Sequence, residues 1–169
     1  MSTYRSTWRS LIVVVCALAS VMAGASSASA QERDWREARD QIEQRARSQR
    51  GAPYRSGGSS PSGFDCSGFT RWVFQGVDVE LPHSSQEQFN MGERDGFKKI
   101  WSRERLEPGD LVFFKTTSAQ VGHVGIYLGE GKFISSSSSS GVRIDSVWDG
   151  YYWGPRWVGA TRHPVTQER

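Results

Sequence analysis

The feature that most constrains the fold is Gly63–Phe69, GFDCSGF, which holds the only cysteine after residue 30. A lone thiol forms no internal disulfide, so the chain must be stabilised by a packed core. Residues 51–63 are rich in Gly, Ser and Pro and predict a loop. The apolar spacing that follows predicts a helix over 66–76. Cys66 is therefore expected in the first turn of a helix.

The first thirty residues have the pattern of a signal peptide. Arg5 and Arg9 precede an apolar run over 11–21, and a small-x-small sequence ends at Ala30. This run is shorter than the roughly 20 residues that span a bilayer. We expect cleavage after Ala30 and no stable membrane span afterwards. An uncleaved anchor and lipidation at Cys16 are alternatives, and the valine before Cys16 disfavours lipidation.

The remaining residues predict one domain with little net charge. Hydrophobic residues make up 37% of the chain and charged residues 23%, as in globular proteins. Without Arg5 and Arg9, the 21 basic residues fall to 19, against 18 acidic ones. This near balance excludes a nucleic-acid-binding function based on charge. We assign 31–50 to an N-terminal helix, 51–163 to the domain and 164–169 to a C-terminal tail.

The order of the predicted elements indicates an α+β fold. Helical spacing extends over 32–48, and Ser84 or Ser85 begins a short helix through Met91. Beyond residue 106 the pattern changes to strands, and the run 135–140 of six serines is expected as a strand end plus loop. Helices followed by strands predict an antiparallel sheet of about five strands. The expected strands are 111–114, 124–128, 132–134, 142–144 and 157–160.

Cys66 is the candidate nucleophile. A thiol gains reactivity when a helix N-terminus or a cation lowers its pKa, and the expected helix start supplies that setting. The alternative is a buried structural cysteine, for which neighbouring Asp, Ser and Gly are a poor environment. Among His83, His123 and His163, His123 opens an apolar strand and is the best candidate base. The histidines and the thiol lack metal-ligand spacing, and no phosphate-binding loop is present, so no metal or cofactor is expected.

Four segments, taken together, resemble the NlpC family of cell-wall cysteine peptidases, which are papain-like hydrolases. Three of them are Gly63–Phe69, Pro108–Phe114 and His123–Gly129. The fourth, Pro53–Gly58, is similar to the tyrosine-bearing loop of that family. The resemblance covers roughly 45–163. It implies a papain-like fold in which the catalytic cysteine helix packs on the antiparallel sheet and the base lies on a strand.

The resemblance also implies roles for single residues. Cys66 matches the nucleophile, His123 the general base and Tyr54 the loop tyrosine, while Asp65 and Ser67 flank the nucleophile as substrate-binding residues. The implied substrate is a peptidoglycan stem peptide, cleaved at an amide involving a D-residue. We accordingly expect an exported protein of the periplasm or cell-wall space that acts as a monomer.

The chain departs from the family pattern at one position. Family members often carry a histidine twelve residues after the base, where it orients the imidazole, and this chain has Ser135 there. Hairpin geometry places Ser135 or Ser137 beside His123. A hydroxyl holds an imidazolium less firmly than a carboxylate. A catalytically weak peptidoglycan-binding module therefore remains an alternative, as does a related papain-like amidase or acyltransferase acting on another substrate.

An aromatic cluster lies near the end of the chain. It contains Trp148, Tyr151, Tyr152, Trp153 and Trp157. Such a cluster could stack on the sugar rings of a glycan or pack against the sheet, and packing is the favoured interpretation.

Overall fold

The computed structural model describes residues 34–94, 96–118 and 120–167. The predicted signal peptide and Cys16 lie outside these ranges. Within them, no helix is both long and apolar enough to span a membrane.

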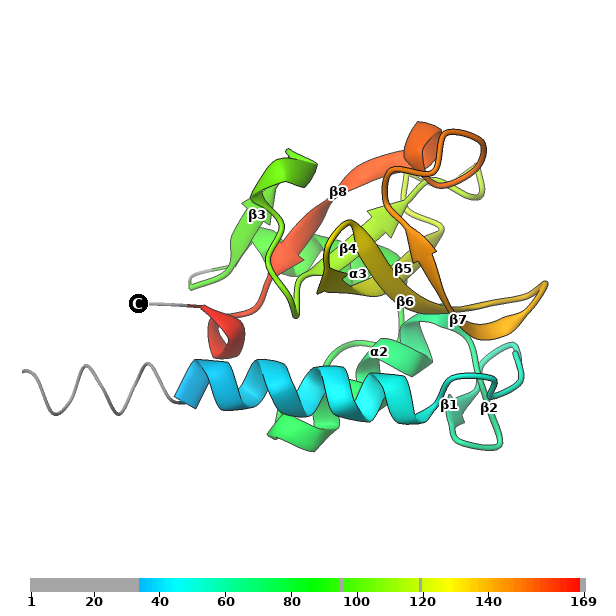
Figure 1. The fold of residues 1–169 in the computed structure, drawn as a ribbon, viewed down its shortest axis with the longest axis horizontal. Helices are drawn as coiled ribbons and strands as arrows, with labels where there is room; N and C mark the ends of the chain where they lie inside the picture. Colours follow the sequence, from blue (N-terminus) through cyan, green and yellow to red (C-terminus); the bar gives the residue numbers. More distant parts are fainter. Residues whose placement is uncertain (1–33, 95, 119, 168–169) are drawn as a thin grey trace, which may run out of the picture.

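The centre of the fold is an antiparallel sheet with the strand order β3-β8-β4-β5-β6-β7 (Figure 1). Its strands are β3 (Lys98–Ile100), β4 (Leu111–Phe114), β5 (His123–Gly129), β6 (Lys132–Ser137), β7 (Gly141–Ser146) and β8 (Trp157–Arg162). A separate ribbon pairs β1 (Ser59–Ser60) with β2 (Gly63–Phe64) just before the cysteine helix.

Helices cover one face of the sheet. An N-terminal helix over 34–48 runs beneath α2 (Cys66–Phe74), and α3 (Ser85–Asn90) lies behind β4 (Figure 1). Short 3₁₀ helices occupy Gln75–Val77, Met91–Glu93, Arg103–Arg105, Gly154–Arg156 and Pro164–Thr166.

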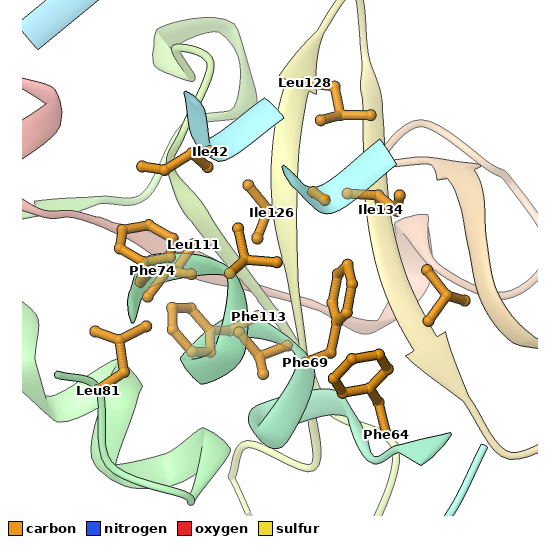
Figure 2. Close-up of a cluster of buried hydrophobic side chains, with 14 of the residues drawn as sticks. Ile42, Phe64, Phe69, Phe74, Leu81, Leu111, Phe113, Ile126, Leu128 and Ile134 are labelled. Carbon is orange, nitrogen blue, oxygen red and sulfur yellow. The ribbon is translucent and has the colours of Figure 1, made fainter. Parts of the chain in front are cut away.

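The main core fills the space between the helices and the sheet. Successive side chains of a strand point to opposite faces, so Val124, Ile126 and Leu128 of β5 all face the helices. Phe69 of α2 and Ile42 of the N-terminal helix pack against this row (Figure 2). Burial of this apolar surface holds α2 against β5 and β6.

The opposite face of the sheet carries a second, aromatic cluster. Phe114 and Phe133 lie side by side with ring centroids 4.8 Å apart, and Trp153 packs against both. Trp153 comes from the segment between β7 and β8, which folds back over this face. His123 and Ser135 project from this same face, because they alternate with the core-facing residues of β5 and β6.

The α+β expectation is confirmed, and all five expected strands are present. The sixth strand, β3, was not expected, because Lys98 and Lys99 hide the alternation of a three-residue edge strand. The serine run divides as predicted: Ser135 to Ser137 end β6, and 138–140 form the turn into β7.

A partly buried ionic cluster joins the two ends of the domain. Arg162 of β8 donates to both oxygens of Asp110, at 2.7 and 2.9 Å, and also to Glu107. Arg39 of the N-terminal helix donates to Glu107 and to the carbonyl of Thr166. The segment predicted as a C-terminal tail thus begins with a 3₁₀ turn held against the first helix (Figure 1).

The substitution Arg162→Met is expected to lower the free energy of unfolding by about 3–5 kcal/mol, because it leaves the fully buried Asp110 without its cation. Urea unfolding measures this loss. The matched control is Arg47→Met, which removes an exposed pair with Glu43 and should change stability by less than about 1 kcal/mol. Equal losses in the two variants would contradict the assigned role of the cluster.

Candidate active site

Cys66 is the first residue of α2, and Asp65 caps that helix. The Asp65 backbone is extended, and its Oδ1 accepts a hydrogen bond from the backbone N–H of Gly68 at 2.7 Å. An aspartate at this position satisfies a helix N–H that has no partner within the helix. The cap therefore fixes where α2 begins and which way the Cys66 side chain leaves it.

The Asp65 carboxylate also gathers the surrounding loops. It accepts from the backbone N–H of Gly57 at 3.0 Å and from the Ser67 hydroxyl at 3.1 Å. The His83 imidazole lies 3.0 Å from both carboxylate oxygens. Sequence reasoning placed His83 only in a turn and missed this contact, since nothing in the spacing of His83 and Asp65 indicates that they meet.

Two glycines let the ribbon approach the cysteine helix. A Cβ atom at Gly68 would lie 2.1 Å from the carbonyl oxygen of Gly58, and one at Gly58 would lie 2.3 Å from that of Gly63. Neither distance leaves room for a side chain. The glycines of the cysteine motif thus serve a close backbone contact, through which the loop that carries Tyr54 approaches α2.

His123 begins β5 and is held on two sides. Its Nε2 lies 2.9 Å from the Ser135 hydroxyl, and its ring lies 4.7 Å from that of Trp153 at an angle of 33°. Of the two serines expected near His123, Ser135 makes this hydrogen bond. When Nε2–H donates to Ser135, Nδ1 keeps its lone pair, which is the state that a general base requires.

Trp153 is held over His123 by a tight turn. The Asp149 carboxylate accepts from the backbone N–H groups of Tyr152 and Trp153 at 2.7 and 2.9 Å. The favoured packing interpretation of the aromatic cluster is confirmed for Trp153, which is buried. Trp148, Tyr151 and Tyr152 are exposed. Sequence reasoning did not foresee that Trp153 packs against the candidate base.

Cys66 and His123 line the same cleft, of about 820 Å³. Tyr54 lines it from the loop before β1, where its backbone bridges to Phe64. Asp65 and Ser67 are absent from the lining, since their side chains bond to each other and to the loops below. The remaining lining residues are mostly hydroxyl-bearing: Thr116, Thr117, Ser136, Ser137, Ser138, Ser139, Ser146 and Tyr152.

The Cys66 thiol is not a preformed thiolate. Burial raises its pKa above the ordinary value and outweighs the lowering by the backbone of Val124. The charge of Asp65 raises this pKa as well, whereas the backbones of Ser67 and Cys66 itself lower it. The effect of the helix start foreseen from the sequence is thus present, but the expectation of a lowered thiol pKa is wrong, because removal from water costs the charged form more.

His123 is correspondingly a neutral imidazole at pH 7. Burial lowers the pKa of His123 from 6.5 to about 4. A neutral thiol and a neutral imidazole in one cleft suit a mechanism in which the base removes the proton during attack, rather than before it. The described residues contain no group of three or more His, Cys, Asp or Glu that could hold a metal ion.

The chain is similar to a known protein family and to several proteins of that family. The family model described as "NlpC/P60 family" matches residues 51–162. Murein DD-endopeptidase MepS/Murein LD-carboxypeptidase of Escherichia coli K12 is 44% identical over 114 residues, which are 67% of this chain and 56% of that protein. Probable endopeptidase NlpC of the same strain is 41% identical over 66% of this chain and 70% of its own length.

A solved structure gives the same result for the fold. The peptidoglycan hydrolase RipB of Mycobacterium tuberculosis superposes with a TM-score of 0.61 at 32% identity, covering 76% of this chain and 66% of that one. The matched part of this chain spans little more than half the length of MepS.

The buried histidines make folding stability depend on pH. Burial lowers the pKa of His123 and of His163 from 6.5 to about 4, so between these values the unfolded chain binds protons that the folded chain does not. Stability is therefore expected to be greatest above pH 6.5 and to fall as the pH drops toward 4, by on the order of 3 kcal/mol for the buried His123 and by less for His163, which is partly exposed to solvent.

Urea unfolding at pH 7, 6, 5 and 4 measures this dependence. His123→Gln and His163→Gln should each remove part of the slope of unfolding free energy against pH. An unchanged slope for His123→Gln would show that the imidazole is not buried in its neutral form.

Proposed function

Since the chain belongs to the NlpC/P60 family, we propose that it is a cysteine endopeptidase that hydrolyses amide bonds of peptidoglycan stem peptides. The observation that carries the proposal is the shared cleft, which is lined by Cys66 at a helix start and by the His123 imidazole, whose Nε2 lies at hydrogen-bond distance from Ser135. The names of the relatives, murein endopeptidases and a peptidoglycan hydrolase, support the substrate class.

The proposed reaction begins with a coupled proton transfer. The Cys66 sulfur attacks the amide carbonyl carbon while its proton passes to the neutral His123 imidazole, and a C–S bond forms. Negative charge develops on the carbonyl oxygen. The backbone N–H of Cys66 at the start of α2 is a candidate donor to that oxygen, since first-turn N–H groups have no partner within the helix.

The two products leave one after the other. The His123 imidazolium gives its proton to the amide nitrogen, the C–N bond breaks and the amine leaves. A water molecule, deprotonated by the same imidazole, then attacks the thioester. The C–S bond breaks, the imidazolium returns its proton to the Cys66 sulfur, and the new carboxylic acid departs and gives its proton to solvent. No cofactor is needed for this balance.

Three further residues have proposed roles around this chemistry. Tyr54 lines the cleft and is 38% exposed, so its phenol is available to a bound peptide. Asp65 and Ser67 support substrate binding from beneath, because their bonds fix the helix start that presents Cys66. The pattern of residues 1–30 supports export to the periplasm or cell-wall space, and we propose that the protein acts there as a monomer.

The decisive experiment compares the protein with Cys66→Ala. Purified muropeptides incubated with the wild type are expected to yield shortened stem peptides by mass spectrometry, and Cys66→Ala is expected to yield none. Both proteins should bind muropeptides, because the cleft stays intact. Identical products from both would refute the catalytic proposal. Binding without turnover by the wild type would indicate a binding module, and turnover of non-wall amides or esters alone would indicate the amidase or acyltransferase.

Ser135 allows a test of imidazole orientation. Ser135→Ala should lower kcat roughly tenfold, because it leaves Nε2–H buried without an acceptor, a cost of about 1–3 kcal/mol. Ser135→His should raise kcat if orientation limits the rate. Circular dichroism checks that both variants fold. A folded Ser135→His enzyme with an unchanged or lower rate would remove the idea that the hydroxyl limits catalysis.

A further inference from the structure

The cleft contains a single side chain that is cationic throughout the physiological pH range. Among the described residues that line it, Arg143 is the only arginine or lysine. His123 does not add a charge there, because its buried imidazole is neutral at pH 7. Asp149 is occupied by the backbone N–H groups of the turn that carries Trp153. The remaining walls are mainly hydroxyl groups together with the Asp145 carboxylate, so Arg143 is the one side chain of this lining that can attract an anion.

Strand register places Arg143 next to the candidate catalytic pair. Arg143 of β7 lies directly opposite Ser135 of β6, and side chains at paired positions share one face of the sheet. Ser135 in turn hydrogen-bonds His123 of β5. Neighbouring strands are about 4.8 Å apart, so the backbones of Arg143 and His123 are separated by two strand spacings and by a two-residue offset along β5, since the register places Ser135 opposite Gly125. An extended arginine side chain covers much of that span.

Asp145 holds the guanidinium in place. Arg143 Nη2 donates to Asp145 Oδ1, and Asp145 lies two residues along β7 on the same face. The Asp145 side chain is only 8% exposed, whereas that of Arg143 is 52% exposed. The guanidinium makes no other hydrogen bond with the described residues. It is thus anchored at one end and has further N–H donors available to a ligand.

The second carboxylate oxygen of Asp145 is an acceptor inside the same wall of the cleft. This oxygen, Oδ2, is buried and has no hydrogen-bond partner among the described residues. Buried carboxylate oxygens in folded proteins are almost always paired, with protein, water or ligand. A carboxylate oxygen accepts hydrogen bonds and does not bind an anion, so the partner of Oδ2 is an N–H or O–H donor, and an anionic ligand group has to be bound by Arg143 itself.

The chemistry of the reaction decides which part of a substrate meets Arg143. His123 must deliver a proton to the leaving nitrogen, so the departing residue lies on the imidazole side of Cys66. Ser135 and Arg143 lie along the sheet from His123, on the two strands that follow β5. The group of the departing residue closest to its nitrogen is the substituent on its α-carbon. A free α-carboxylate at that position matches the planar donor pattern of a guanidinium.

We propose that Arg143 binds the free α-carboxylate of the leaving-group residue and so selects which amide is cut. This inference rests on the proposed peptidase function. The favoured bonds are those whose departing residue is an amino acid with an unblocked α-carboxyl. In a wall built on diaminopimelate, these are the crosslink to its D-centre and the bond to a terminal D-residue. Amides are disfavoured when the α-carboxyl group of the departing residue is itself joined in a further peptide bond.

Two matched peptides test the proposal. Both contain D-alanine joined to the D-centre amine of diaminopimelate, and they differ only in a free α-carboxylate or a carboxamide on that centre. The wild-type protein should cleave the free acid with a kcat/KM roughly ten- to a hundredfold higher than that for the carboxamide. This ratio corresponds to the loss of charge-assisted hydrogen bonds, and it should arise chiefly from a lower KM for the free acid. In Arg143→Met this ratio should fall to about one, and Arg143→Lys should retain part of it.

Control variants separate binding from folding. Arg47→Met removes an exposed arginine of the N-terminal helix and should keep the wild-type ratio. The pair Arg143→Met with Asp145→Asn avoids an unpaired buried carboxylate, and its ratio should also be about one. A wild-type enzyme that hydrolyses muropeptides through Cys66 but cleaves both peptides equally overturns this inference alone. An absence of Cys66-dependent hydrolysis overturns the proposed function as well.

Discussion

The arrangement of the site depends on one carboxylate, that of Asp65. Its oxygens cap α2 through Gly68, accept from Gly57 and contact the His83 imidazole. A helix start, the glycine-rich loop and a distant turn therefore converge on one side chain. Removal of this carboxylate would leave several donors unpaired at once, a larger loss than that of an ordinary cap. The position of Cys66 follows from this junction, because Cys66 is the next residue along the chain.

The second constraint is the register of β5, β6 and β7. Alternation along β5 turns Val124 toward the helices and His123 toward the aromatic face. The pairing of β6 with β7 then sets Ser135 opposite Arg143. A shift of one residue in either pairing would turn these polar side chains into the core. The same hydrophobic pattern that stabilises the sheet thus also orders the base, its orienting hydroxyl and the proposed carboxylate site.

Burial governs the electrostatics of the pair. Both Cys66 and His123 lie where charge is costly, so the thiol pKa rises and the imidazole pKa falls. The helix start and the Val124 backbone oppose this effect at the thiol but do not reverse it. The resulting neutral pair makes proton transfer part of the attack itself. A hydroxyl partner such as Ser135 is compatible with this state, since the imidazole carries no standing charge for it to stabilise.

The sequence by itself determined the α+β class, the five apolar strands and the helix start at Cys66, because these follow from local periodicity and turn residues. It also indicated that Ser135 or Ser137 lies near His123, since hairpin geometry is local. The contact of His83 with Asp65 and the packing of Trp153 on His123 were decided only by tertiary structure. These residues are far apart in the chain, and no spacing rule joins them. The pKa of Cys66 was misjudged for the same reason, because burial is a property of the assembled fold.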